Sequence, residues 1–286
     1  MALDLVEVIE NVEALDKAAN PLADVVGKVL PAGPAKDLLS GTRLGHPVHP
    51  ILTDVVIGAW TSATFLDLFG GEASEQAADR LIALGLAAVA PTALTGWSDW
   101  ADAWGKARRI GLVHAGANVA GALIFASSLA ARKRGSRGLG KALSLMGMGV
   151  TTFTAYLGGH LTFRKGVGVD ETTFEEGPAD WTQLMDEADL PERTPVTATV
   201  DGVTIMFYRS GEDVHAIADR CSHRGGPLHE GECDGETVTC PWHASMFRLA
   251  DGSIVRGPAI APQPRYEVRI EGGKVLVRRD PSELHA

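Results

Sequence analysis

Few cysteines and a shortage of positive charge set the first limits on this chain. Its 286 residues carry 26 lysines and arginines against 36 aspartates and glutamates, which gives a net charge of −10. Nucleic-acid binding requires a concentrated basic face, so this balance argues against DNA or RNA as a partner. The three cysteines, Cys221, Cys233 and Cys240, offer no disulfide framework, which favours a reducing compartment.

The N-terminus lacks the basic region and cleavage site of a secretory signal, so we expect residues 4–19 to be retained in the mature protein. Apolar residues recur there at helical spacing opposite acidic ones, which predicts an amphipathic helix that stops before Pro21. A helix that lies on a membrane surface is basic on its polar face, whereas this one is acidic. Packing on the protein itself or on a partner is therefore expected, and residues 21–45 are interpreted as short helical pieces.

Long apolar segments dominate the middle of the chain. Four follow one another, at about residues 51–69, 81–97, 110–131 and 142–163. Each is near the length of about 20 residues that spans a bilayer, and each is rich in small residues that let helices approach closely. A soluble bundle is the alternative, because Asp54, Asp67 and Pro91 interrupt the first two segments. The favoured prediction is an all-α, four-helix transmembrane bundle in contact with membrane lipid, hence a multi-pass protein of the cell membrane.

Four antiparallel spans would place four histidines on one side of the membrane: His46, His49, His114 and His160. Asp54, Asp99 and Asn118 fall in the same half, as do three tryptophans at positions 97, 100 and 104. One interpretation is structural, with polar groups that cap helices and an aromatic belt at the interface. The other is functional, because ionisable groups inside a membrane are costly and usually mark a path. Two of the histidines would then hold a haem b, or this group of polar residues would line a quinone pocket.

The C-terminal third contains the most specific motif, Cys221-x-His223 followed by Cys240-x-x-His243. Two thiolates on one iron and two imidazoles on another form the ligand set of a Rieske 2Fe-2S centre. A tetrahedral zinc site uses the same ligand types, but such sites usually group two cysteines and then two histidines. Here each loop carries one of each, which favours the iron–sulfur cluster.

Short alternating segments surround this motif and indicate a β domain. Strands are predicted at 196–200, 203–209, 214–218, 237–240, 247–249, 266–270 and 274–278, after a helical turn at 181–190. The predicted organisation is an N-terminal helical segment (1–45), a four-span helical domain (46–163), a solvated linker (164–180) and an all-β cluster domain (181–286).

The ligand loops resemble the Rieske ferredoxin family. The resemblance rests on CSHRGGPLHEG at 221–231, CPWHASMF at 240–247 and GPA at 257–259, and it covers roughly residues 180–280. It implies a small antiparallel β domain with the cluster at its tip, acting as a one-electron carrier. Rieske proteins of cytochrome bc complexes carry an extra disulfide between the ligand loops, whereas Gly226 and Trp242 stand here. The chain is therefore similar to the ferredoxin-type branch.

Two further residues in this resemblance concern the reduction potential. Ser245 stands where the high-potential branch has a serine that bonds a cluster sulfur, and Phe247 stands where that branch has a tyrosine. One such hydrogen bond instead of two implies an intermediate potential, since these bonds stabilise the reduced cluster.

A second resemblance covers the opening of the helical domain. The run LSGTRLGHPVHPILTD at 39–54 is similar to a bacterial family of four-span membrane proteins of unknown function that share a His-Pro-x-His-Pro motif. It implies a fold and brings no activity with it.

These parts predict a membrane-anchored Rieske protein that passes single electrons between a membrane donor, a quinone or a haem, and a partner redox protein. A self-contained oxygenase would need a further domain for mononuclear iron, and the β domain leaves no room for one. The alternative is a redox-sensing or structural subunit. Lysines and arginines flank both sides of the spans equally and do not decide the orientation. Because Rieske clusters are normally assembled in the cytoplasm, a cytoplasmic β domain is the expectation.

Overall fold

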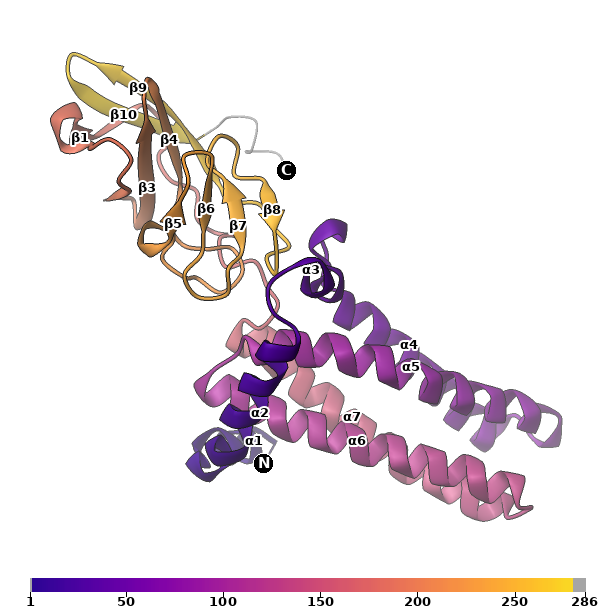
Figure 1. Ribbon diagram of the computed structural model, residues 1–286. Helices are drawn as coiled ribbons and strands as arrows, with labels where there is room; N and C mark the ends of the chain where they lie inside the picture. Colours follow the sequence, from indigo (N-terminus) through magenta and orange to yellow (C-terminus); the bar gives the residue numbers. More distant parts are fainter. Residues whose placement is uncertain (1, 280–286) are drawn as a thin grey trace. The chain divides into compact units, whose positions relative to one another are not determined.

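The computed structural model of the protein describes residues 2–279, which fall into two compact units (Figure 1). Residues 2–30 and 48–167 form a helical unit. Residues 31–47 and 168–279 form a second unit, called the β unit below, which contains every strand of the described residues. The expected fold class, helical at the N-terminus and all-β at the C-terminus, is confirmed. The expected N-terminal segment 1–45, however, is divided between the two units.

Four long helices form the body of the helical unit, and they cover the four apolar segments. They are α4 (Val48–Phe69), α5 (Glu75–Ala101), α6 (Gly105–Lys133) and α7 (Arg137–Lys165). Among the described residues, α4, α5 with the turn before it, and α6 are long and apolar enough to cross a membrane. Helix α7 is as long as α6 but is not among the helices that meet this criterion. The count of four spans therefore stays a prediction.

Glycines allow close packing within each helical hairpin. Trp60 of α4 lies against Gly85 of α5, where a Cβ would be 2.2 Å from the indole Nε1. Phe125 of α6 lies against Gly147 of α7, where a Cβ would be 2.8 Å from the ring. The two aromatic rings stack on each other with centroids 4.1 Å apart. Small residues thus let the helices approach, and the rings fill the space between the two hairpins.

A buried ionic network joins the four helices at the opposite end from their histidines. The Arg132 guanidinium of α6 donates to both carboxylate oxygens of Asp67 on α4, and to Asp79 of α5 over 3.1 Å. It also donates to the Ser144 hydroxyl of α7 over 2.9 Å, and Arg137 donates to Asp79 over 2.8 Å. Because a buried guanidinium requires all of its partners, this network fixes how the helix ends pair.

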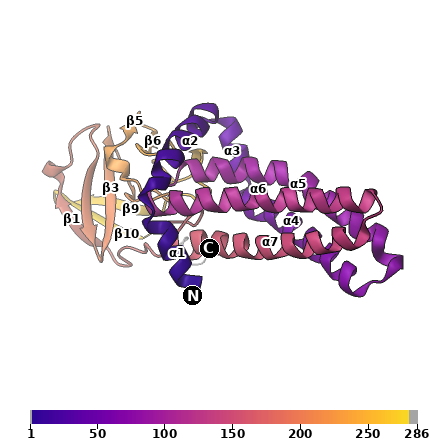
Figure 2. The ribbon, with the colours of Figure 1, turned by 90° about the horizontal axis from the view of Figure 1, so that it is seen from below.

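The N-terminal segment forms α1 (Ala2–Asn11), the turn η1 (Glu13–Leu15) and α2 (Asp16–Val29). The predicted stop before Pro21 is wrong, because Pro21 lies inside α2. Proline removes one intrahelical hydrogen bond, but contacts with α6 hold this helix: Arg109 donates to both oxygens of Asp16, and Arg108 donates to Asn20 over 2.9 Å. Figure 2 shows α1 and α2 crossing the ends of the long helices. The segment therefore packs on the protein itself.

Two antiparallel sheets form the second unit, with strand orders β1-β10-β9-β4-β3-β2 and β5-β6-β7-β8. The strands are β1 (Thr182–Asp186), β2 (Val196–Val200), β3 (Val203–Ser210), β4 (Asp213–Ala218), β5 (Glu232–Cys233), β6 (Thr237–Thr239), β7 (Met246–Arg248), β8 (Ile254–Arg256), β9 (Arg265–Glu271) and β10 (Lys274–Arg279). The seven predicted strands are all present. The predicted helical turn at 181–190 is wrong over its first part, because β1 pairs there with β10 as an edge strand before the short turn η4 (Glu187–Asp189).

The segment after α7 differs from the predicted solvated linker 164–180. Helix α7 continues to Lys165, and the chain from Gly168 onward packs on the β unit. The Glu171 N–H donates to the Ser222 carbonyl over 2.9 Å, and the Glu171 carboxylate accepts from Arg220. Glu171, an acidic residue of the predicted linker, thus has a basic partner on the β unit.

Candidate metal centre

Two loops at one end of the β unit carry the four predicted ligands, and their backbones have the same geometry. They comprise residues 221–226, after β4, and residues 240–245, between β6 and β7. In each loop, the cysteine N–H donates to the carbonyl of the residue five positions later, and the N–H of the residue four positions later donates back to the cysteine carbonyl. These hydrogen bonds are 2.8–3.0 Å long. That fourth residue has a positive φ, 72° at Gly225 and 60° at Ala244. Equivalent turns thus present the two cysteines.

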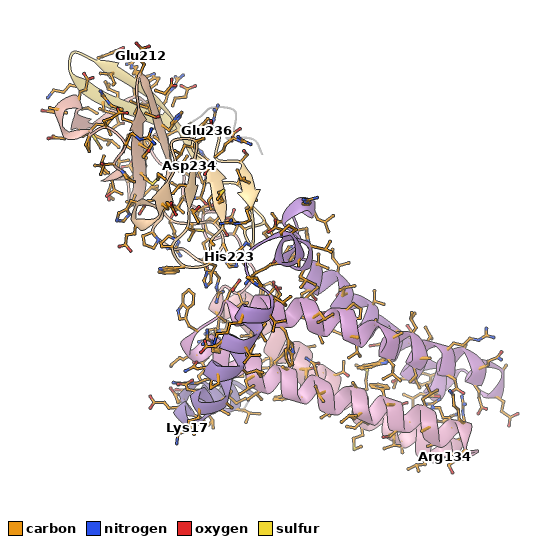
Figure 3. All side chains as sticks on the ribbon, viewed as in Figure 1. Lys17, Arg134, Glu212, His223, Asp234 and Glu236 are labelled. Carbon is orange, nitrogen blue, oxygen red and sulfur yellow. The ribbon has the colours of Figure 1, made fainter. Side chains whose placement is uncertain are left out.

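The four side chains form two pairs at different depths. The thiols of Cys221 and Cys240 are 1% and 3% exposed and are hydrogen-bonded to each other. The imidazoles of His223 and His243 are half-buried and meet edge to face, with ring centroids 5.1 Å apart. Figure 3 places His223 at the end of the β unit that lies away from Glu212. The thiols therefore lie in the interior and the imidazoles near the surface.

This arrangement fits a 2Fe-2S cluster, in which each iron takes two protein ligands. Within residues 2–279, no three histidine, cysteine or acidic side chains converge to hold a single ion, as a zinc site would require. A glycine also keeps space beside the thiols. A Cβ at Gly226 would lie 2.8 Å from the Cys240 Sγ and 3.0 Å from the Trp242 ring. A cysteine pair on one iron and a histidine pair on the other match the residues present.

The local electrostatics favour the protonation states that bind metal. The hydrogen bond from Cys221 lowers the pKa of Cys240 to about 7 against the effect of burial, and the N–H groups of Trp242 and His243 assist. The same bond raises the pKa of Cys221. Burial, followed by the neighbouring His243, lowers the pKa of His223 well below its usual range. A thiolate and neutral imidazoles are the forms that ligate metal.

Two residues that support the first loop had no predicted role. Gln263, 1% exposed, accepts the Ser222 N–H over 2.7 Å and donates to the Arg220 carbonyl over 2.9 Å. The Asp219 carboxylate accepts both the N–H and the Nδ1–H of His229. The one signal in the sequence is that Gln263 stands between two prolines, which leave its backbone little chance to join a strand.

Ser245 connects the second ligand loop to a third loop, at residues 257–259. Its buried hydroxyl oxygen accepts the Ala259 N–H over 3.0 Å. A hydroxyl that accepts this bond still has its own proton to donate, so the bond to a cluster sulfur stays a prediction. Phe247 is fully buried in the core beneath the loops.

The third loop, at Gly257, is held by the segment that precedes the first long helix. There α3 (Pro34–Ser40) and the turn η2 (Thr42–Leu44) pack on the β unit. The Asp37 carboxylate accepts the Gly257 N–H over 3.0 Å, and a Cβ at Gly257 would lie 2.0 Å from the Thr42 hydroxyl. Lys36 is 5% exposed. Sequence reasoning missed this closure because its partners are 220 residues apart.

Two of the four histidines predicted for a haem or quinone site have local partners. His46 belongs to the β unit, is exposed, and donates through Nδ1 to the Pro47 carbonyl over 3.0 Å. His160 lies at the end of α7 with Nε2 3.2 Å from the Glu10 carboxylate. That carboxylate also accepts from Lys165 over 2.7 Å. Glu10 thus ties α1 to α7.

The other two histidines lie inside the helical unit. His49 of α4 has Nδ1 3.0 Å from a backbone carbonyl of α5, and His114 of α6 has Nδ1 2.9 Å from a carbonyl of α7. Asn118, one turn further along α6, donates to His114 Nε2 over 3.0 Å. Asp54 of the same predicted polar half is exposed, and Trp100 donates to the backbone carbonyl at the start of α6. The four histidines therefore do not share one environment.

Comparison with known proteins gives two family matches. Residues 180–267 match the model of the Rieske [2Fe-2S] domain, and residues 45–171 match that of a predicted membrane protein family, DUF2231. Over 91 residues the chain is 38% identical to the 3-phenylpropionate/cinnamic acid dioxygenase ferredoxin subunit of Escherichia coli (strain K12), which covers 32% of this chain and 85% of that subunit. The subunit of the same name from Shigella boydii serotype 4 (strain Sb227) is 37% identical over the same coverage. Among solved structures, the ferredoxin of carbazole 1,9a-dioxygenase from Nocardioides aromaticivorans IC177 is 28% identical, with a TM-score of 0.34 over 36% of this chain and 100% of that one.

Proposed function

Because the chain belongs to the Rieske [2Fe-2S] family, we propose that it is a one-electron carrier anchored in the cell membrane. Its β unit is a ferredoxin-type Rieske domain, homologous to ferredoxin subunits of dioxygenases. The observation that carries the proposal is the pair of buried thiols below a pair of half-buried imidazoles. The carrier takes electrons from a membrane donor, a quinol or a haem, and passes them to a partner redox protein.

Each residue of the site has a role in this proposal. When bound, a 2Fe-2S cluster takes up and releases one electron. Cys221 and Cys240 hold the inner iron as thiolates, and His223 and His243 hold the outer iron as neutral imidazoles. Fully buried side chains of the core, among them Phe247, exclude water from the thiol side.

Electron exchange is proposed to occur at the imidazole end. His223 and His243 are half-buried, whereas both thiols are covered. Trp242, between Cys240 and His243 in the second loop, is 47% exposed. Aromatic side chains are enriched where proteins bind one another, so Trp242 is a contact for the partner.

The two chain segments that make up the β unit support an even number of membrane crossings. Pro31–Pro47 precedes the long helices and the rest of the unit follows them, yet the two parts pack together through Asp37 and Gly257. Both parts must therefore lie on the same side of the membrane, which requires an even number of crossings between them. Three crossings do not satisfy this condition, so we count α7 as the fourth span. The β unit faces the cytoplasm, where Rieske clusters are assembled.

Spectroscopy with kinetics tests the carrier. The full-length protein in lipid vesicles should show the electron paramagnetic resonance signal of a mixed cysteine–histidine cluster on reduction. Decyl-ubiquinol as donor and cytochrome c as acceptor should then give repeated turnover, and Trp242→Ala should slow transfer to the acceptor without changing the potential. A cluster that is reduced once and does not turn over with any donor would favour the redox-sensing alternative.

Cysteine labelling tests the topology. Single cysteines replace the exposed residues Arg43, Ser136 and Glu212, and whole cells are treated with an impermeant thiol reagent. Four spans with a cytoplasmic β unit require Arg43→Cys and Glu212→Cys to be protected and Ser136→Cys to react. If only one of Arg43→Cys and Glu212→Cys reacted with the reagent, an even number of spans would be contradicted.

A further inference from the structure

His49 and His114 occupy equivalent sites on two different helices. His49 Nδ1 contacts the Thr92 carbonyl of α5, and a Cβ at Gly96, one turn on, would lie 2.6 Å from its ring. His114 Nδ1 contacts the Thr154 carbonyl of α7, and a Cβ at Gly158, again one turn on, would lie 3.3 Å from its ring. Each imidazole thus rests on a glycine and is oriented by a backbone carbonyl four residues earlier.

This equivalence belongs to a duplication of the whole helical unit. His49 lies eleven residues before Trp60, and His114 lies eleven residues before Phe125. The glycines that receive these side chains show the same spacing on the partner helices, at 85 and 96 on α5 and at 147 and 158 on α7. Buried positions of the first and third helices also correspond: Val56, Trp60, Ala63 and Asp67 on α4 with Gly121, Phe125, Ser128 and Arg132 on α6.

The duplication directs both imidazoles to the same interior. Eleven residues are about three helical turns, or about 16 Å, so each histidine shares a helix face with its aromatic residue. Trp60 and Phe125 meet across the two hairpins with ring centroids 4.1 Å apart. His49 and His114 lie three turns toward the other end of the same two faces, and therefore face that interior as well.

The hydrogen bonds also fix the tautomer of both rings. A carbonyl oxygen only accepts, so Nδ1 carries the proton in His49 and in His114. The Asn118 amide donates to His114 Nε2, as this tautomer requires. In both rings the lone pair is then on Nε2; in His114 it accepts the Asn118 amide, a hydrogen bond that iron ligation would replace. A backbone carbonyl on Nδ1–H is the usual second partner of a histidine that ligates metal.

We infer that His49 and His114 are the two axial ligands of a haem b held between the α4–α5 and α6–α7 hairpins. Only two protein ligands are needed, because the tetrapyrrole supplies four nitrogens of its own. A bare divalent ion is not favoured, since no three histidine, cysteine or acidic side chains converge in the part of the chain that the structure describes. His46 belongs to the β unit, and Nε2 of His160 carries the proton that the Glu10 carboxylate accepts, so neither offers a lone pair to this interior. The inference rests on the proposed carrier function, for which a haem iron that changes by one electron is a matched membrane donor.

Haem binding to the full-length protein tests this inference directly. Protein is produced with and without δ-aminolevulinic acid, purified in detergent and titrated with hemin. We expect one haem for each chain, with the optical and low-spin spectra of bis-histidine ligation. His49→Ala and His114→Ala should each weaken hemin binding by at least about tenfold. His46→Ala and His160→Gln are matched controls and should bind as the wild type does.

A second variant tests ligation even if alanine disturbs the fold. His114→Met keeps a ligand atom and should retain the haem with a raised reduction potential, as for histidine–methionine ligation. No haem in the wild-type protein, or equal hemin binding by a His49→Ala/His114→Ala double variant, would overturn the inference. The reduced cluster signal separates this result from the carrier function: a haem-free protein that still turns over with quinol overturns the haem alone. A haem-loaded protein whose cluster accepts no electrons overturns the carrier function and leaves the haem ligands standing.

Discussion

The β unit and the helical unit both present paired ligands from repeated frames, but they repeat different kinds of structure. The β unit repeats a six-residue loop, at 221–226 and 240–245, with identical hydrogen bonds. The helical unit repeats a whole hairpin, in which a large side chain of one helix rests on a glycine of the next. A short loop fixes its ligands through backbone turns and positive φ angles, whereas a hairpin fixes them through side-chain volume.

The difference determines what each unit tolerates. A metal-binding loop depends on the identity of its ligands and on one left-handed residue, so single substitutions at those positions should abolish the site. A helical hairpin depends on matched sizes and on one buried ionic network, so substitutions should reduce its stability in steps. The following predictions test this contrast, from the largest expected effect to the smallest.

Loss of a thiol ligand should have the largest effect. Cys240→Ser removes half of the inner pair, so we expect no 2Fe-2S signal and a less stable β unit, because metal binding and folding are coupled. Cys233→Ser is the matched control and should keep the full signal, since Cys233 lies on β5 outside the ligand loops. Iron and sulfide analysis together with electron paramagnetic resonance measures both. A cluster of normal spectrum in Cys240→Ser would exclude this cysteine as a ligand.

Removal of the buried guanidinium should be the largest change in the helical unit. Arg132→Met leaves Asp67 buried without its partner, and breaking such a pair typically lowers the free energy of unfolding by about 3–5 kcal/mol. The neighbouring Lys133 is exposed, so Lys133→Met should have little effect. Unfolding of the purified protein in detergent, followed by circular dichroism, gives the comparison. Equal stability of the two variants would show that the network does not hold the helix ends.

The glycine positions should show a smaller, graded effect. Gly147→Leu places a side chain where the Phe125 ring lies, and such overpacking costs about 1–3 kcal/mol. Gly149→Leu, two residues on, has open space around its Cβ and should be tolerated. The same unfolding measurement applies, and the cluster signal should be unchanged in both. If Gly149→Leu were the more destabilising variant, the size-matching account of the hairpins would fail.

Ser245→Ala should change the cluster without removing it. Loss of a hydrogen bond to a cluster sulfur destabilises the reduced form, so the potential should fall; a tenfold change in the equilibrium constant corresponds to about 59 mV for one electron. Ser210→Ala, at the end of β3 and outside both ligand loops, is the control. A redox titration that gives the same potential for wild type and Ser245→Ala would rule out the bond.

Glu10 should show a small effect that depends on pH. Burial raises the pKa of this carboxyl, but the bonds from Lys165 and His160 outweigh it and hold the pKa below the ordinary 4.5. The stabilisation is therefore present above pH 4.5 and is lost as the pH falls through the lower value of the folded protein. Proteolysis near α1 should accelerate below pH 4.5 in the wild type. In Glu10→Gln it should be fast at neutral pH and nearly independent of pH.

Much of the β unit could be predicted from the sequence, because its signals are local. Alternation and turn dipeptides located seven strands, and the spacing of Cys221, His223, Cys240 and His243 predicted the ligand loops before any fold was known. The short edge strand β1 was missed because its pairing partner, β10, lies about ninety residues away. Gln263 and Asp37 were missed for the same reason, since their roles exist only once distant segments meet.

The helical unit shows the opposite limit. Apolar runs located four helices well, but the duplication was not found in the sequence. Its two halves share few residue types beyond His49 with His114 and the glycines, since a hairpin requires matched sizes and not matched identities. Pro21 was interpreted as a helix stop, although the contacts from Arg108 and Arg109 of α6 outweigh the lost hydrogen bond. At Pro21, tertiary contacts overrode local propensity.

The contact between Asp37 and Gly257 also sets an order of events during synthesis. Asp37 leaves the ribosome 220 residues before its partner, a delay of about 10–40 s at typical elongation rates. In the proposed four-span topology, four helices enter the membrane during that time, while α3 has no surface to pack on. The β unit is therefore completed last, and its third loop closes only after the membrane segment is in place. A fragment that begins at Gly168 would lack α3 and should be joined to residues 31–47 before its cluster is studied alone.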